Sequence, residues 1–225
     1  MPPGDASLLW ARLRAAQLDF LFHVQGGRDG WAGSGVLYRL CSPHPLYDVS
    51  LLPYAIWIGA MPFYGFRIIW VGTVNLVLGM FMNWGIRARC PRHVDARLRM
   101  LAQVSPHGFP CMEVHMATAL CADVAWFAGM PWCWAVMVAV VALVVVTRVF
   151  SVSYFPDQIA GSVISGACGV VGAHMAGERF IPLGLTHQMH LILIFVVIFI
   201  VMAYVSYLAE QNASPFMRVP RADCA

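Results

Sequence analysis

Lysine is absent from this sequence, and all fourteen basic residues are arginine. Any site that binds a phosphate group must therefore use Arg or His as its cation. Charged residues of either sign are also scarce, at 11% of 225 residues, whereas 60% are apolar. Because a soluble domain carries about a quarter charged residues, this composition indicates an integral membrane protein.

Paired cysteine spacing is lacking as well. The seven Cys residues are scattered, and several lie in apolar runs. This distribution favours small buried hydrophobes over a zinc or disulfide framework. The net charge of +3 is small and dispersed, so it gives no indication of nucleic-acid binding. We expect no metal, no cofactor and no nucleic-acid partner.

Six apolar segments are each near the ~20 residues that cross a bilayer core. They are Leu46–Pro62, Phe66–Ile86, Pro110–Gly129, Trp132–Phe150, Gln158–Ala176 and Leu191–Ala209. The first is short and contains Asp48 and Pro53. The pattern predicts an all-α, polytopic membrane domain over residues 46–209, followed by a C-terminal tail at 210–225.

Residues 1–45 precede the first span. Met1–Gln25 places Leu9, Leu13 and other apolar residues at helical spacing beside Arg12, which predicts an amphipathic helix at the membrane interface. The glycine-rich segment 26–35 predicts a loop. Twelve of the fourteen arginines fall on the side of the two termini, so the positive-inside rule places both termini in the cytosol or the mitochondrial matrix.

The most specific pattern lies in Thr147–Gly166, TRVFSVSYFPDQIAGSVISG. It resembles the third signature of the glucose-6-phosphatase branch of the type 2 phosphatidic acid phosphatase superfamily, which reads Ser-Arg, five residues, then His-Phe-Pro-x-Gln. The matching residues are Arg148, Phe155, Pro156, Gln158, Gly161 and Gly166. Tyr154 stands at the position of the family's nucleophilic His.

The other two signatures of that family are degenerate here. The segment before Pro91 resembles the first signature, but Asn83 replaces its Lys and Cys90 replaces its Arg. The segment GFPCMEVHMATA resembles the second, with Cys111 in place of Ser and His115 two residues later than expected. Arg87 and Arg89 lie beside the lost cations, either compensating for them or serving as ordinary interfacial arginines.

The resemblance covers roughly residues 46–176 and implies the superfamily's helical bundle. In active members, the Lys and both Arg hold the phosphoryl oxygens, one His attacks phosphorus and the other protonates the leaving group. Loss of one charge-stabilising donor costs ~10²–10³ in rate, and loss of a nucleophile costs about 10⁴–10⁶. We therefore predict a pseudoenzyme with a vestigial set of positions: Asn83, Cys90, Cys111, His115, Arg148 and Tyr154.

Three functions fit this interpretation. The first is an accessory or structural subunit of a larger membrane protein complex. The second is the binding of an anionic phospholipid at the vestigial site by Arg148, Arg89, Arg87 and His115. This function is compatible with the first. The third is an active phosphatase acting on lipid or sugar phosphates with an altered site. The resemblance implies that the protein lies in the membrane of the endoplasmic reticulum. The basic amphipathic N-terminal segment is also compatible with the mitochondrial inner membrane.

Ionisable residues also occur within the predicted third span. Glu113, His115 and Asp123 lie on it, and such groups normally face the bundle interior with a partner. Two interpretations remain open, a proton or ligand path and a buried polar network that includes Arg148. In the fifth predicted span, the small residues around Gly161, Gly166 and Gly169 favour close helix packing.

Overall fold

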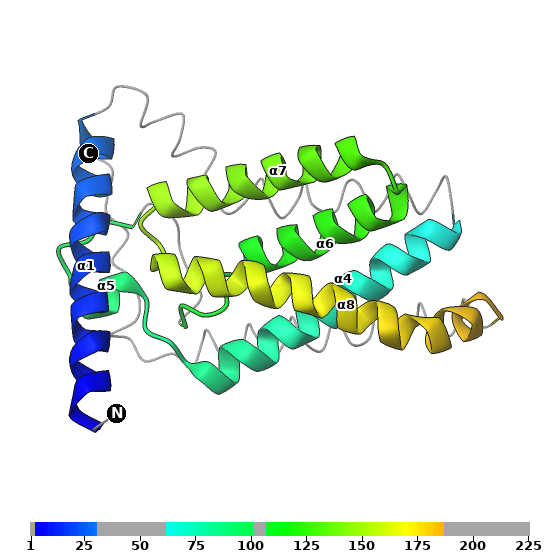
Figure 1. Ribbon diagram of the computed structural model, residues 1–225, viewed down its shortest axis with the longest axis horizontal. Helices are drawn as coiled ribbons and strands as arrows, with labels where there is room; N and C mark the ends of the chain where they lie inside the picture. The colour runs from blue at the N-terminus through cyan, green and yellow to red at the C-terminus, as the bar shows by residue number, and fades with distance from the viewer. Residues whose placement is uncertain (1–2, 31–61, 101–106, 187–225) are drawn as a thin grey trace, which may run out of the picture. The chain divides into compact units, whose positions relative to one another are not determined.

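The structure is a computed structural model that describes residues 3–30, 62–100 and 107–186 (Figure 1). Two compact units divide the chain, Met1–Glu178 and Arg179–Ala225, and the contacts reported below belong to the first. All regular elements in the described ranges are helices. The predicted span Leu191–Ala209, the tail 210–225 and the predicted span Leu46–Pro62, apart from its last residue, lie outside these ranges.

Four long helices correspond to the predicted spans between residues 66 and 176. They are α4 (Pro62–Ile86), α6 (Met112–Ala128), α7 (Pro131–Phe150) and α8 (Pro156–Thr186). Three stretches are long and apolar enough to cross a membrane: Arg67–Val94, Pro131–Phe150 and Pro156–Gly177. This confirms the class of helical membrane protein. With 17 residues, α6 falls short of the ~20 residues of a full crossing.

Proline and glycine set the helix boundaries. Helices α7 and α8 both begin at a Pro, which has no N–H to leave unbonded in a first turn. Helix α6 ends at Gly129, whose φ of 65° is left-handed and whose N–H donates to Ala125 at 3.3 Å. Pro131 then starts α7, so α6 and α7 form a tight helical hairpin.

Helix α1 (Pro3–Asp29) is longer than the sequence predicts. The predicted loop at 26–35 is wrong at its start, because Gly26 and Gly27 are helical. Each glycine costs a helix about 1 kcal/mol relative to Ala, yet the last turn is held by Arg28. This guanidinium is buried and donates to the Phe150 carbonyl at 3.3 Å, so a tertiary contact overrides the local preference.

One face of α1 packs where α7 ends and α8 begins. Leu21 is fully buried with Leu98, Val152 and Phe155, and Arg14 pairs with Asp157 at the start of α8. Fourteen residues separate Arg14 from Arg28, which is ~21 Å along a helix. Because both reach the same end of the bundle, α1 lies across it. On another side of α1, apolar side chains remain exposed, and they are Leu9, Leu13 and Phe20.

Small residues allow α4, α6 and α8 to approach closely. Val71, Ala119, Val170 and Ala173 form a buried apolar cluster between these three helices. At Gly166, an added Cβ would lie 2.5 Å from the His115 carbonyl oxygen. The predicted close packing through the α8 glycines is therefore confirmed.

Candidate functional site

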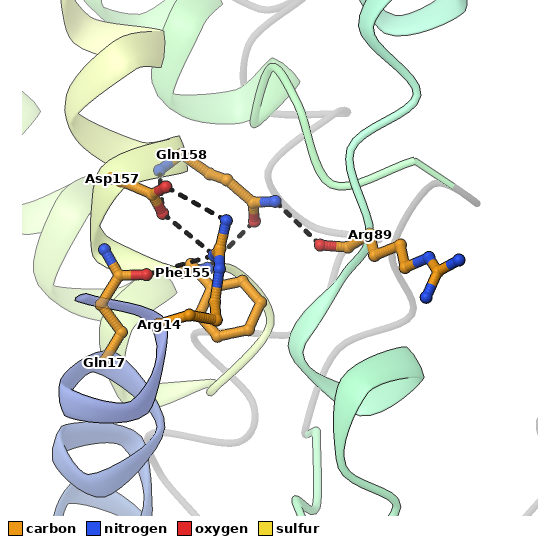
Figure 2. Close-up of polar contacts among 6 residues, drawn as sticks. All are labelled: Arg14, Gln17, Arg89, Phe155, Asp157 and Gln158. Atoms are coloured by element: carbon orange, nitrogen blue, oxygen red, sulfur yellow. Dashed lines mark hydrogen bonds and ion pairs between the residues drawn. The ribbon is translucent and has the colours of Figure 1, made fainter. Parts of the chain in front are cut away.

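The turn between α7 and α8 is held by a side chain of the Phe-Pro-x-Gln pattern. Gln158 accepts a hydrogen bond from the Phe155 N–H at 3.0 Å through Oε1. Its Nε2 donates to the Arg89 carbonyl at 2.9 Å (Figure 2). Gln158 thus connects the third signature segment to the first, although 69 residues separate Gln158 from Arg89.

Arg14 of α1 closes over this turn. Its guanidinium stacks on the Phe155 ring, 4.1 Å from the centroid, and contacts both Asp157 oxygens at 3.4 Å (Figure 2). The sequence interpretation assigned Arg14 to an amphipathic helix and missed this role. No local pattern reveals it, because the partner lies 143 residues away.

Arg148 lies beneath the turn at 1% exposure and forms an ion pair with Glu113. Its Nη1 is 3.5 Å from Glu113 Oε1. The other Glu113 oxygen accepts from the Cys111 thiol at 3.3 Å and from the Tyr154 hydroxyl at 3.5 Å. These four residues are called the Arg148 cluster below. The buried Arg148 cation is therefore neutralised by Glu113, a carboxylate that has no counterpart in the signatures.

Tyr154 is buried in the same cluster. Burial raises the pKa of its phenol well above the ordinary value of 10.0, and the nearby Glu113, Cys111 and Cys90 raise the pKa further, whereas Arg148 opposes them. The phenol is consequently neutral and a poor nucleophile. Four of the six positions that the sequence analysis predicts to be vestigial interact electrostatically here, and they are Cys90, Cys111, Arg148 and Tyr154.

Two nitrogens of Arg148 have no hydrogen-bond partner. Nε and Nη2 are both buried, and a buried unbonded donor costs free energy. Ordered water or a small anion would satisfy them. A phospholipid headgroup would reach them only after the turn moved, since Arg148 and Tyr154 are both at most 2% exposed.

The two remaining vestigial residues have structural contacts. His115 Nε2 lies 3.0 Å from the Asn75 carbonyl and must donate to it, while Nδ1 lies 2.8 Å from Ser165 Oγ, whose hydroxyl also donates to the Ser162 carbonyl at 3.1 Å. Asn83 is buried and donates to the His107 carbonyl at 3.3 Å. These bonds occupy both ring nitrogens of His115.

The exposed arginines of the predicted lipid site lie apart from Arg148. Arg87 and Arg89 are both exposed, whereas Arg148 is buried. The Arg89 guanidinium points away from Gln158 (Figure 2). The structure therefore does not assemble Arg148, Arg89, Arg87 and His115 into a common pocket.

Asp123 belongs to a second buried cluster. Its Oδ1 lies 3.2 Å from Arg67 Nε and 2.7 Å from His174 Nε2. Of the polar network suggested for this helix, the structure pairs Glu113 with Arg148, whereas Asp123 pairs with Arg67 and His174 instead. The sequence interpretation did not identify Arg67 and His174 as partners of Asp123. One signal was available for Arg67. If α4 and α6 run antiparallel, the start of α4, with Arg67, and the end of α6, with Asp123, lie on the same side of the membrane.

Comparison of the chain with protein-family models, with characterised proteins and with solved structures gives no match. Within the described residues, no group of three or more His, Cys, Asp or Glu side chains could hold a metal ion.

Proposed function

We propose that this protein is a non-catalytic membrane protein with a phosphatase-like bundle, acting as an accessory or structural subunit of a larger membrane complex. The observation that carries the proposal is the buried cluster at Arg148. There, the cation is paired with Glu113 at 3.5 Å, and a neutral phenol occupies the position at which the enzymes that the sequence resembles have their nucleophile. Phosphoryl transfer requires uncompensated cations around the phosphoryl oxygens.

The contacts of His115 support the same conclusion. Its two ring nitrogens bond Asn75 and Ser165 within the bundle, so it is not positioned to protonate a leaving group beside Tyr154. An exposed apolar face on α1, formed by Leu9, Leu13 and Phe20, offers a surface for a neighbouring subunit or for the bilayer.

Phosphate release from an aryl phosphate tests the absence of catalysis. We expect the protein, purified in mild detergent and returned to lipid nanodiscs, to release phosphate at the rate of empty nanodiscs. Arg148→Ala and Tyr154→Phe should leave that rate unchanged. Turnover that both substitutions abolish would establish the alternative, an active phosphatase with an altered site.

Isolation under mild detergent tests the subunit role. The expected result is a particle larger than this 24.8 kDa chain and its detergent belt, containing defined partner proteins in fixed ratio. Recovery of the chain alone, at natural abundance and in several mild detergents, would contradict the role.

A further inference from the structure

The C-terminal end of α4 carries an unusual arginine. Arg87 follows the last helical residue with a φ of 46°, a left-handed conformation that is uncommon outside glycine. Its N–H contacts the Asn83 carbonyl at 3.4 Å, and its Nε donates to the Trp84 carbonyl at 3.1 Å. This bond uses Nε and not the two terminal nitrogens of the exposed guanidinium, so those nitrogens can bind another group.

The backbone of His107 lies beside this end of α4. Asn83 bonds Arg87 through its carbonyl and His107 through its side chain, and the Gly108 N–H donates to the Ala88 carbonyl at 2.6 Å. Burial lowers the pKa of His107, and the positive charges of Arg87 and His93 lower it further. Arg87 and His107, with His93 acting electrostatically on His107, make up the group called the α4-end cluster below; its permanent positive charge is that of Arg87.

The segment that carries this cluster, residues 87–107, contains little negative charge that could neutralise it. Between residues 87 and 107 the sequence contains one carboxylate, Asp95. Arg97 binds that carboxylate at 2.7 Å. Five arginines share the segment, and they are Arg87, Arg89, Arg92, Arg97 and Arg99.

Apolar side chains lie on α4 directly before the cluster. Phe81, Trp84 and Ile86 are 66%, 49% and 55% exposed, and α4 lies in a stretch apolar enough to cross a membrane. An exposed aromatic residue followed by cations is typical of the depth where acyl chains give way to headgroups. A ligand at this position would contact apolar groups on one side and positive charge on the other.

We propose that Arg87, His93 and His107 bind the phosphate of an anionic phospholipid, whose acyl chains pack beside Phe81 and Trp84. The guanidinium offers paired N–H donors that match phosphate oxygens, and the histidines add charge when protonated. The exposed apolar face selects a membrane lipid over free phosphate. This site is separate from Arg148 and does not depend on the proposed absence of catalysis.

Native mass spectrometry of the delipidated protein in neutral detergent measures this binding directly. We expect tighter binding of phosphatidylglycerol than of phosphatidylcholine. Removal of the Arg87 charge and the His107 imidazole in Arg87→Gln/His107→Gln should weaken phosphatidylglycerol binding about fivefold or more and leave phosphatidylcholine binding unchanged. An excess of inorganic phosphate should not compete.

A matched variant removes the same types of side chain elsewhere. Arg12→Gln/His23→Gln changes two exposed residues of α1 and should keep the preference for phosphatidylglycerol. Equal binding of the two lipids, an equal loss in both double variants, or competition by phosphate would each overturn the proposal. If Arg87→Gln/His107→Gln does not fold, His93→Gln tests the same site at an exposed position.

The pH dependence gives a second readout. A protonated His107 attracts phosphate more strongly than a neutral one, and its pKa lies below the ordinary 6.5. Phosphatidylglycerol binding should therefore strengthen as the pH falls below about 6.5, and the bound lipid should raise the His107 pKa. His107→Gln should reduce this dependence, and an unchanged pH profile in that variant would contradict a role for His107.

Discussion

Arg148→Ala should lower the free energy of unfolding by about 3–5 kcal/mol, because it leaves a largely buried carboxylate without its partner. The Glu113 side chain is 13% exposed and would keep only the weak donors of Cys111 and Tyr154. Unfolding in mixed micelles, followed by helical circular dichroism, measures the loss.

Removing both charges should restore most of that stability. Glu113→Gln/Arg148→Met keeps similar side-chain volumes and leaves no unpaired buried charge. Arg12→Ala, at an exposed position on α1, is the matched control and should stay near the wild-type value. A loss below about 1 kcal/mol for Arg148→Ala, typical of a surface pair, would show that Arg148 is not buried with Glu113.

Gly166→Ala should destabilise the bundle by about 1–3 kcal/mol, the usual cost of overpacking. The added methyl group would lie 2.5 Å from the His115 carbonyl oxygen and 3.1 Å from Thr118 Cβ. The first of these atoms belongs to the backbone of α6, so relief requires α6 and α8 to separate.

Gly172→Ala is the control on the same helix. No atom lies within 4 Å of a Cβ built at Gly172, and Ala is a better helix former than Gly by about 1 kcal/mol. This variant should therefore match or exceed the stability of the wild type. Equal losses in the two variants would show that the close approach at Gly166 does not limit packing.

Much of the helical architecture follows from the sequence. Long apolar runs and the prolines that start α7 and α8 place the starts of those helices within two residues of the predictions, whereas α8 continues ten residues past its predicted end at Ala176. The end of α1 was not predictable, because Gly26 and Gly27 favour a loop, whereas distant contacts of Gln25 with the backbone of Arg97 and Arg99, and of Arg28 with Phe150, hold this end of the helix. The number of spans in the whole chain stays a prediction.

The candidate site follows from the sequence only in part. Motif spacing predicts that Cys90, Cys111, Arg148 and Tyr154 belong to one site; in the structure Cys90, Cys111 and Arg148 each act electrostatically on Tyr154, and their shared role stays a prediction. The pairing of Arg148 with Glu113 belongs to the polar network that the sequence left open, but the signatures give Glu113 no role and could not single it out as the partner. Arg67, Asp123 and His174 lie on three different helices. The spacing of residues within one span does not predict how neighbouring helices align, so this cluster could not be predicted.

Helix α1 also shields the end of the bundle where α7 ends and α8 begins. Loss of Leu21 and Arg28 would uncover Val152 and Phe155 and strip the Phe150 carbonyl of its donor. Cleavage after α1 would therefore expose an apolar end of the bundle.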